Sequence, residues 1–306
     1  MKYIKPALDH ESLADLLLSR GLIADRATLI ARLKVTSYFR LSGYLYPFRT
    51  ADDSFQPGST LTQVERLYDF DHRLRGLLLD AIESIEVHVR STLAHRFALD
   101  HGPFGYLDPM NFPKFDPAHD DFGKWERKLR EQIDRAANLK GKEEFIIHFN
   151  QKYGDAEPIP PVWMACELMD FGTTLSFYRG VKVPLRRLVG DALGQPEEVV
   201  LSWLLSLNAI RNRCAHHARL WNWTMGYAMR IPSARKNPDW HEASMASNRT
   251  GMALFVCRYW LDRIGLKREW TAGVSALFDD YPGIPPADLG LPANWRQTAL
   301  WLTRSR

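Results

Sequence analysis

The sequence predicts an all-α protein, and three observations support this fold class. Apolar residues recur at helical spacing through most of the 306-residue chain. No segment shows a convincing alternation of apolar and polar residues, which is the signature of a half-buried strand. One amphipathic stretch that follows residue 61 is much longer than the average helix of about 11 residues. Helices of that length are typical of helical bundles.

The N-terminal segment is expected to form short helices. Residues 11–23 carry an apolar stripe that ends at Gly21, a typical helix stop. Residues 27–49 begin as a helix and then become aromatic and irregular. Residues 52–60 are rich in turn-forming residues and predict a connector to the next element.

A long helix is predicted after this connector. Thr62 and Glu65 fit a capping box, in which each side chain satisfies a free backbone donor of the first turn. The helix is expected to continue to about Ala98. Its apolar side is formed by Leu67, Phe70, Leu74, Leu77, Leu78, Ile82, Ile85 and Val89.

Further helices are predicted in the rest of the chain, separated by loops rich in Gly, Pro and aromatic residues. They are expected over residues 121–139, 142–153, 162–180, 196–219 and 249–265. We expect three regions within one compact unit. These are an N-terminal helical segment, a helical core and a C-terminal helical extension, over residues 1–60, 61–230 and 231–306.

Composition narrows the class of protein. The net charge is only +4, so the chain as a whole is not a polycation. Cys166, Cys214 and Cys257 lie far apart in sequence and form no CxxC pair, which argues against a disulfide scaffold or a zinc ribbon and favours a reducing compartment. The start lacks the apolar stretch of a signal peptide, and the longest apolar run, residues 199–210, is too short to span a bilayer. We therefore expect a soluble cytoplasmic protein without membrane contact.

Positive charge is concentrated in one region. No Asp or Glu occurs between Val199 and Asn237. The cations of this stretch are Arg211, Arg213, Arg219, Arg230, Arg235 and Lys236. Such a patch is typical of phosphate binding, and its last five cations are candidate RNA-binding residues. Each arginine alone also fits a solvated helix end whose charge complements the helix dipole.

The helix over residues 196–219 ends in polar and cationic residues. On a regular helix Asn208, Asn212, His216 and Arg219 form one stripe, and Arg211 lies on its flank. Burying such groups without partners would cost several kcal/mol. The stripe is therefore expected to face water, a polar partner or a cleft.

An imidazole beside arginines suits RNA cleavage. A neutral histidine can accept the proton of a ribose 2′-hydroxyl, and arginines can stabilise the extra charge of a phosphorane. DNA lacks the 2′-hydroxyl, so this chemistry selects RNA. The spacing of Arg211 and His216 is not specific by itself, because it recurs at Arg90 and at Arg96. It also places the two side chains about 140° apart on an ideal helix.

Seven segments, in chain order, extend over nearly the whole sequence. They read SYFRLSGYLYPFR, FQPGSTLTQVERLYDFDHRLRGLLLDAIESIEVHVRS, HGPFGYLD, PPVWMACELMDFGTTLSFYRG, SLNAIRNRCAHHARLWN, KNPDWH and YPGIPPADLGLPANW. Together they resemble the Abi family of bacterial abortive infection proteins. That family is placed in the HEPN superfamily of all-α proteins, many of which are ribonucleases.

The resemblance implies roles for three residues. The HEPN motif is an arginine, a polar residue, a short gap and a histidine, so the catalytic roles fall on Arg211, Asn212 and His216. Arg90 and Arg96 do not inherit them, because their surroundings do not match. The resemblance further implies an HEPN-like bundle as the core, no cofactor, and a homodimer whose two-fold interface builds a composite site. An antitoxin or a small RNA is an additional possible partner.

Several other residues have both a functional and a structural interpretation. His217 is either a second catalytic imidazole or a packed neighbour. Glu83 and Glu86 either support the site by pairing with Arg211 or Arg90, or form surface salt bridges. The aromatic segment 37–49 is either a base-stacking surface or part of the core. The group Cys214, His216 and His217 resembles metal ligands only loosely, and we expect no metal.

The expected function is that of a metal-independent endoribonuclease in an abortive-infection or toxin system. It would cut RNA by 2′-hydroxyl attack and leave a 2′,3′-cyclic phosphate. One alternative is an HEPN module that binds RNA or a nucleotide without cutting it. Another is a component of a phage-defence system that binds another protein.

Overall fold

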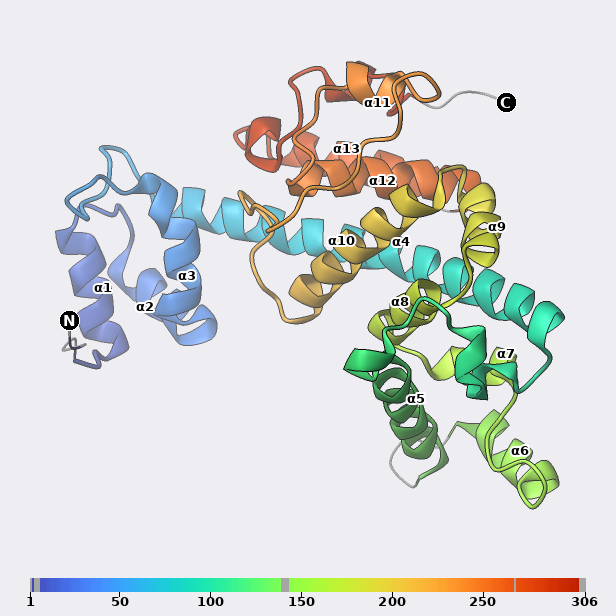
Figure 1. The fold of residues 1–306 in the computed structure, drawn as a ribbon. Coiled ribbons are helices and arrows are strands. Elements are labelled where there is room, and N and C mark those ends of the chain that lie inside the picture. Colours follow the sequence, from blue (N-terminus) through green and yellow to red (C-terminus); the bar gives the residue numbers. More distant parts are fainter. Residues whose placement is uncertain (1, 3–5, 139–142, 267, 303–306) are drawn as a thin grey trace. The chain divides into compact units, whose positions relative to one another are not determined.

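The computed structural model describes residues 2, 6–138, 143–266 and 268–302, and Figure 1 shows that they are built from helices. These residues form thirteen α-helices and seven short 3-10 helices. Within the described ranges there is no strand, only three isolated β-bridges. The predicted all-α fold class is therefore confirmed. The predicted helix ends at Leu139 and Lys142 lie outside the described residues.

The chain divides into two compact units. The first comprises Met1–Gly76 and Ala276–Pro285, and the second comprises Leu77–Ser275 and Pro286–Arg306. Two continuous helices, α4 (Leu61–His101) and α13 (Arg268–Asp280), contribute residues to both units. The division therefore differs from the predicted boundaries at residues 60 and 230. Two of its three boundaries fall within α4 and α13, and the third lies between Pro285 and Pro286.

The first unit contains three short helices before α4. They are α1 (His10–Ser19), α2 (Arg26–Thr36) and α3 (Tyr38–Leu45), followed by the 3-10 turn η1 (Tyr46–Phe48). Each α-helix begins with a side-chain cap, in which Asp9, Asp25 or Ser37 accepts a backbone N–H of the first turn. These caps explain why the segment breaks into short helices.

The long helix α4 was predicted correctly, but its capping box was not. The box is formed by Thr60 and Gln63: the Thr60 N–H donates to Gln63 Oε1 at 2.8 Å, and the Gln63 N–H donates to Thr60 Oγ1 at 3.2 Å. Thr62 is an exposed helical residue, and Glu65 pairs with Arg32 at 3.4 Å. The predicted pair, Thr62 and Glu65, and the observed pair, Thr60 and Gln63, have the same residue pattern. The helix begins at Leu61, directly after the preceding turn, and this start makes Thr60 the capping residue.

The second unit holds the remaining helices. They are α5 (Asp121–Ala137), α6 (Glu144–Tyr153), α7 (Val162–Ala165), α8 (Phe171–Gly180), α9 (Val183–Leu193), α10 (Glu197–Ala215), α11 (Asp239–Glu242) and α12 (Thr250–Arg263). The 3-10 turns are η2 (Gly105–Leu107), η3 (Pro109–Asn111), η4 (Pro117–His119), η5 (Cys166–Leu168), η6 (Pro286–Leu289) and η7 (Trp295–Gln297). Helix α10 packs against α8, α9 and α12, so it lies at the centre of this unit.

Three helix predictions need correction. The segment 162–180 is not one helix, because the Asp170 side chain accepts the Thr173 N–H at 2.7 Å and caps a new helix, α8, there. Helices α9 and α13 were not predicted. Both are short amphipathic elements, and α9 packs against α10, which follows it directly, and against the more distant α12.

The structure also describes the state of the cysteines and the apolar character of the helices. Cys166, Cys214 and Cys257 are free thiols, and all three are buried. No helix within the described ranges combines the length and the apolar character needed to cross a membrane.

Candidate active site

Helix α10 ends at Ala215, and the motif residues lie on its last turn. The His216 N–H donates to the Asn212 carbonyl at 2.9 Å and closes the helix. His217 then adopts a positive φ of 57°, a left-handed conformation typical of the residue that ends a helix. The predicted helix over 196–219 is therefore four residues too long. Arg219 does not extend the helical stripe, because the chain has already turned.

The three predicted catalytic residues differ in exposure. His216 and Asn212 are exposed, whereas Arg211 and Asn208 are half-buried. No carboxylate oxygen among the described residues lies within 4.0 Å of an Arg211 nitrogen. The guanidinium and the imidazole are thus accessible to a ligand, which is what an anion-binding site at this helix end requires.

A carboxylate on α4 is electrostatically coupled to Arg211. The pKa of Glu86 is raised, because burial of its carboxyl outweighs the attraction of Arg211 and Arg90 and is reinforced by the charges of Asp170 and Glu83. Glu83 itself is exposed. Neither Glu83 nor Glu86 has a carboxylate oxygen within 4.0 Å of a cationic nitrogen among the described residues, so the structure forms neither the predicted pairs with Arg211 or Arg90 nor a surface salt bridge there.

Arg90 has a structural position. It donates from Nη1 to the Met169 carbonyl at 3.0 Å, and its Nη2 lies 3.4 Å from a Glu167 oxygen. These contacts tie α4 to the segment before α8. The charge of Arg90 also acts on the Glu86 carboxyl.

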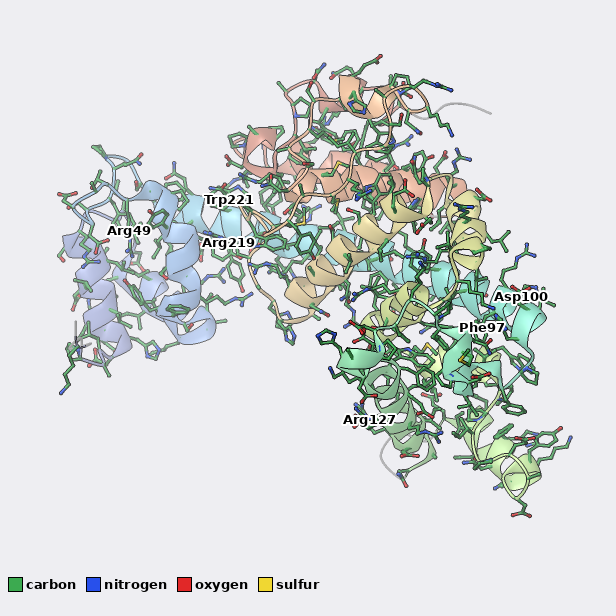
Figure 2. All side chains as sticks on the ribbon, viewed as in Figure 1. Arg49, Phe97, Asp100, Arg127, Arg219 and Trp221 are labelled. Atoms are coloured by element: carbon green, nitrogen blue, oxygen red, sulfur yellow. The ribbon has the colours of Figure 1, made fainter. Side chains whose placement is uncertain are left out.

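Two of the predicted RNA-binding arginines contact the loop that follows α10: Arg213 from the last turn of the helix and Arg219 from the loop itself. Arg213 donates to the Arg219 carbonyl at 2.7 Å, and its guanidinium lies 4.3 Å from the centre of the Trp223 ring. Arg219 lies 5.7 Å from the Trp221 ring, and both residues sit on the loop that leaves the helix (Figure 2). Both guanidinium groups therefore help to hold the loop, which restricts how they can contact RNA.

The other three predicted RNA-binding residues lie away from the motif. Trp203 Nε1 donates to the Arg230 carbonyl at 2.8 Å, so the chain has returned to the first half of α10 by this point. Arg230, Arg235 and Lys236 are all exposed. Between residues 203 and 211 the helix rises about 12 Å. The acid-free stretch thus does not form one patch around His216, because it folds back along α10.

Sequence reasoning missed the anchoring role of the motif's last residues. The Leu220 carbonyl accepts from Thr250, and Trp221 Nε1 donates to Asp288 at 3.1 Å. Arg249 donates both to Asn222 Oδ1 at 2.7 Å and to the Asp288 carbonyl at 2.6 Å. These partners are 30 or more residues away in most cases, so no local pattern indicates them. The contacts fix the chain immediately after the candidate site.

The neighbouring histidine and cysteine do not gather into a metal site. His217 is exposed, and Cys214 is buried on the inner side of α10. Within the part of the chain that the structure describes, no three His, Cys, Asp or Glu side chains are placed to hold a metal ion.

Comparison with known proteins identifies the family. The model of the Abi-like protein family matches residues 31–222, which include α4, α8, α10 and the whole RNRCAHHARLWN segment. No curated protein and no solved structure matches the chain. The match covers more than half of the chain and connects it with abortive infection as a phage-defence role. The chain with Arg211 and His216 at the end of α10 belongs to the family of Abi-like proteins.

Proposed function

We propose that this protein is an HEPN-type endoribonuclease that acts in abortive infection. One observation supports the proposal most directly. The last turn of α10 presents an exposed imidazole, His216, together with a guanidinium, Arg211, that has no carboxylate within 4.0 Å among the described residues. Phosphate binding alone needs no imidazole, so the combination favours cleavage over binding.

The reaction follows from the chemistry of these groups. His216 takes the proton of the ribose 2′-hydroxyl, and the 2′-oxygen forms a bond to the adjacent phosphorus. Arg211 stabilises the added negative charge of the phosphorane. The bond from phosphorus to the 5′-oxygen then breaks, and that oxygen receives a proton from an imidazolium. The products are a 2′,3′-cyclic phosphate and a free 5′-hydroxyl, without any oxidant or cofactor.

Two further residues support the proposed site. The exposed Asn212 is one turn before His216 and is proposed to orient the imidazole or the phosphate. Glu86 attracts Arg211 from α4 and is a positioning residue for the guanidinium. We also propose that a second copy of the chain completes the site. Two copies of Arg211 and His216 would then face one phosphate. Arg211 from one copy and His216 from the other could act together, although the two side chains lie about 140° apart on an ideal helix.

The proposal is tested by incubating the purified protein with RNA in the presence of EDTA. Cleavage with 2′,3′-cyclic ends is expected, and His216→Ala is expected to reduce the rate about 10²–10⁴-fold, the usual contribution of a general acid–base residue. His241→Ala, which alters a histidine whose Nε2 bonds the Pro232 carbonyl, is the control. Cleavage that is unchanged in the His216 variant, or that requires Mg²⁺, would contradict the proposal. Salt-sensitive RNA binding without any product would favour a non-catalytic module.

The composite site is tested by mixing two inactive variants. Arg211→Ala and His216→Ala are each expected to be inactive alone. A mixed dimer of the two retains one Arg211 and one His216, so partial activity should return after subunit exchange. If the mixture stays as inactive as its components while size measurements show exchange, the site does not span two copies.

A further inference from the structure

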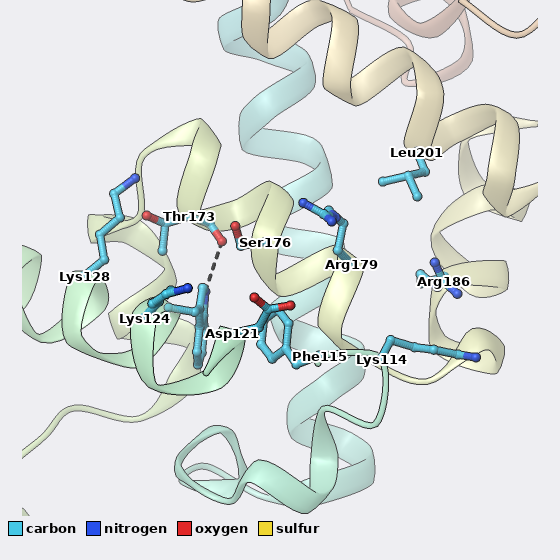
Figure 3. Close-up of a pocket in the computed structure, with 11 residues that line it drawn as sticks. Lys114, Phe115, Asp121, Lys124, Lys128, Thr173, Ser176, Arg179, Arg186 and Leu201 are labelled. Atoms are coloured by element: carbon cyan, nitrogen blue, oxygen red, sulfur yellow. Dashed lines mark hydrogen bonds between the residues drawn. The ribbon is translucent and has the colours of Figure 1, made fainter. Parts of the chain in front are cut away.

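A basic pocket lies in the second unit, away from the motif. Its volume is about 470 Å³, and Figure 3 shows side chains from α5, α8, α9, α10 and the loop before α5 around it. The pocket is lined by Lys114, Phe115, Asp121, Lys124, Trp125, Lys128, Thr173, Ser176, Arg179, Arg186 and Leu201. Pockets of this size can hold small-molecule ligands.

The lining has an excess of positive charge. Lys128 pairs with Asp170 at 2.9 Å, and Arg186 lies 3.4 Å from Glu197. Lys114, Lys124 and Arg179 have no carboxylate within 4.0 Å among the described residues. The one acidic side chain in the lining is Asp121, whose carboxylate accepts the Asp116 N–H. Three cations without an ion pair therefore face one carboxylate, which favours an anionic ligand.

A buried donor adds to this preference. The Arg186 side chain is only 11% exposed, and within the described part of the chain its Nε has no hydrogen-bond partner. A buried donor without a partner is costly, so such a group is expected to find an acceptor. Figure 3 shows Arg186 on the side of the pocket that also bears Lys114.

The opposite part of the lining offers an aromatic surface. Phe115 is half-buried and stacks on Phe112 at a centroid separation of 5.4 Å. Trp125 is fixed by its Nε1 bond to the Thr173 carbonyl at 3.1 Å, the dashed line in Figure 3. Trp125 is buried, at 4% exposed, so the ring that the lining offers to a ligand is that of the half-buried Phe115. An aromatic ring beside cations without an ion pair suits a ligand that has both a phosphate and a flat ring.

The pocket is distinct from the proposed cleavage site but shares a helix with it. Leu201 and Asn212 lie on one face of α10, since they are eleven residues apart and three turns of a helix take about eleven. The rise between them is about 16 Å. A ligand in the pocket would therefore be separated from Arg211 by several helical turns.

From these observations we infer that the pocket is a binding site for the phosphate of a nucleotide. The exposed cations Lys124 and Arg179 bind the phosphate, and the half-buried ring of Phe115 contacts the base. The nucleotide is either free or part of an RNA strand, since both carry the same groups. The inference does not require RNA cleavage by His216.

The test is calorimetric titration of the full chain with ATP, with inorganic phosphate and with a single-stranded RNA oligonucleotide. Lys124→Gln and Arg179→Gln are each expected to weaken binding of ATP about tenfold or more, the equivalent of one charge-assisted hydrogen bond. Asp121→Asn is expected to tighten it. Lys152→Gln and Arg187→Gln change exposed cations outside the lining and serve as matched controls.

The outcomes distinguish a free nucleotide from an RNA strand as the ligand, and they distinguish the pocket from the proposed cleavage site. Binding of ATP that depends on Lys124 and Arg179 indicates a free nucleotide. If only the RNA binds in this way, and His216→Ala leaves its affinity unchanged, the pocket holds part of an RNA strand. If neither ligand binds at millimolar concentration, or if the control variants weaken binding equally, the inference is overturned. RNA cleavage that persists in Lys124→Gln and Arg179→Gln would leave the proposed function intact in that case.

Discussion

Asp71 is a fully buried carboxylate in the first unit, and its partners determine what it contributes. It accepts from Tyr44 Oη at 2.6 Å and pairs with Arg75, one turn further along α4. Burial and the negative charge of Asp71 raise the pKa of Tyr44, so the phenol stays protonated as a donor. The three groups satisfy one another and join α3 to α4.

Removing this carboxylate should be strongly destabilising. Asp71→Ala leaves the Arg75 guanidinium, only 4% exposed, without its counter-charge. The expected loss is about 3–5 kcal/mol in the free energy of unfolding, measured by urea titration. Asp69→Ala changes an exposed carboxylate in the same helix and should cost less than about 0.5 kcal/mol. Similar losses in both variants would mean that the buried pair contributes little.

Glu86 gives a prediction about pH. Its folded-state pKa is raised, so the protonated carboxyl is favoured in the folded protein. The corresponding stability is present at pH values below the unfolded pKa and is lost as the pH rises through the folded pKa. Glu86→Gln should therefore raise the urea midpoint at pH 7 and have little effect near pH 4. Glu83 is an exposed neighbour, so Glu83→Gln should change the urea midpoint less at both pH 7 and pH 4. An equal change in the two variants would contradict burial of the Glu86 carboxyl as the cause.

At the scale of single elements, the start of α4 distinguishes two capping boxes of identical pattern. Thr60→Ala removes the side chain that accepts the Gln63 N–H and should cost about 1 kcal/mol of stability. Thr62→Ala lies within the helix and should be nearly neutral or slightly favourable, because alanine has the higher helix propensity. Thermal unfolding of the two variants side by side measures the difference. If Thr62→Ala lowered the unfolding temperature more than Thr60→Ala, the helix would start two residues later than the structure shows.

At the scale of the whole molecule, the family-matched segment depends on the chain that follows it. Trp221 and Asn222 bond to Asp288 and Arg249, and α10 packs against α12. A fragment that ends at residue 222 should therefore lose cooperative unfolding and expose apolar surface. Circular dichroism during heating, with the full chain as reference, tests this. A fragment that unfolds at the same midpoint would show that residues 31–222 fold independently.

The sequence by itself determined the helical class and the long helix α4, and it placed the Arg211–His216 motif near the end of a predicted helix. Each of these depends on local spacing: apolar residues at helical period, and the Arg211–His216 interval. The family match identifies the chain as Abi-like.

Only the tertiary structure decided where α10 ends, where the cations lie and what surrounds Arg211. The Ala218 N–H bonds the Arg213 carbonyl and turns the chain, which returns residues 230–236 to the other half of α10. The basic pocket joins side chains from positions 114 to 201, and no local pattern brings them together. The positions of the cations and the lining of the pocket have one physical reason. Helix propensity and capping act over a few residues, whereas burial and charge pairing depend on partners that are distant in the chain.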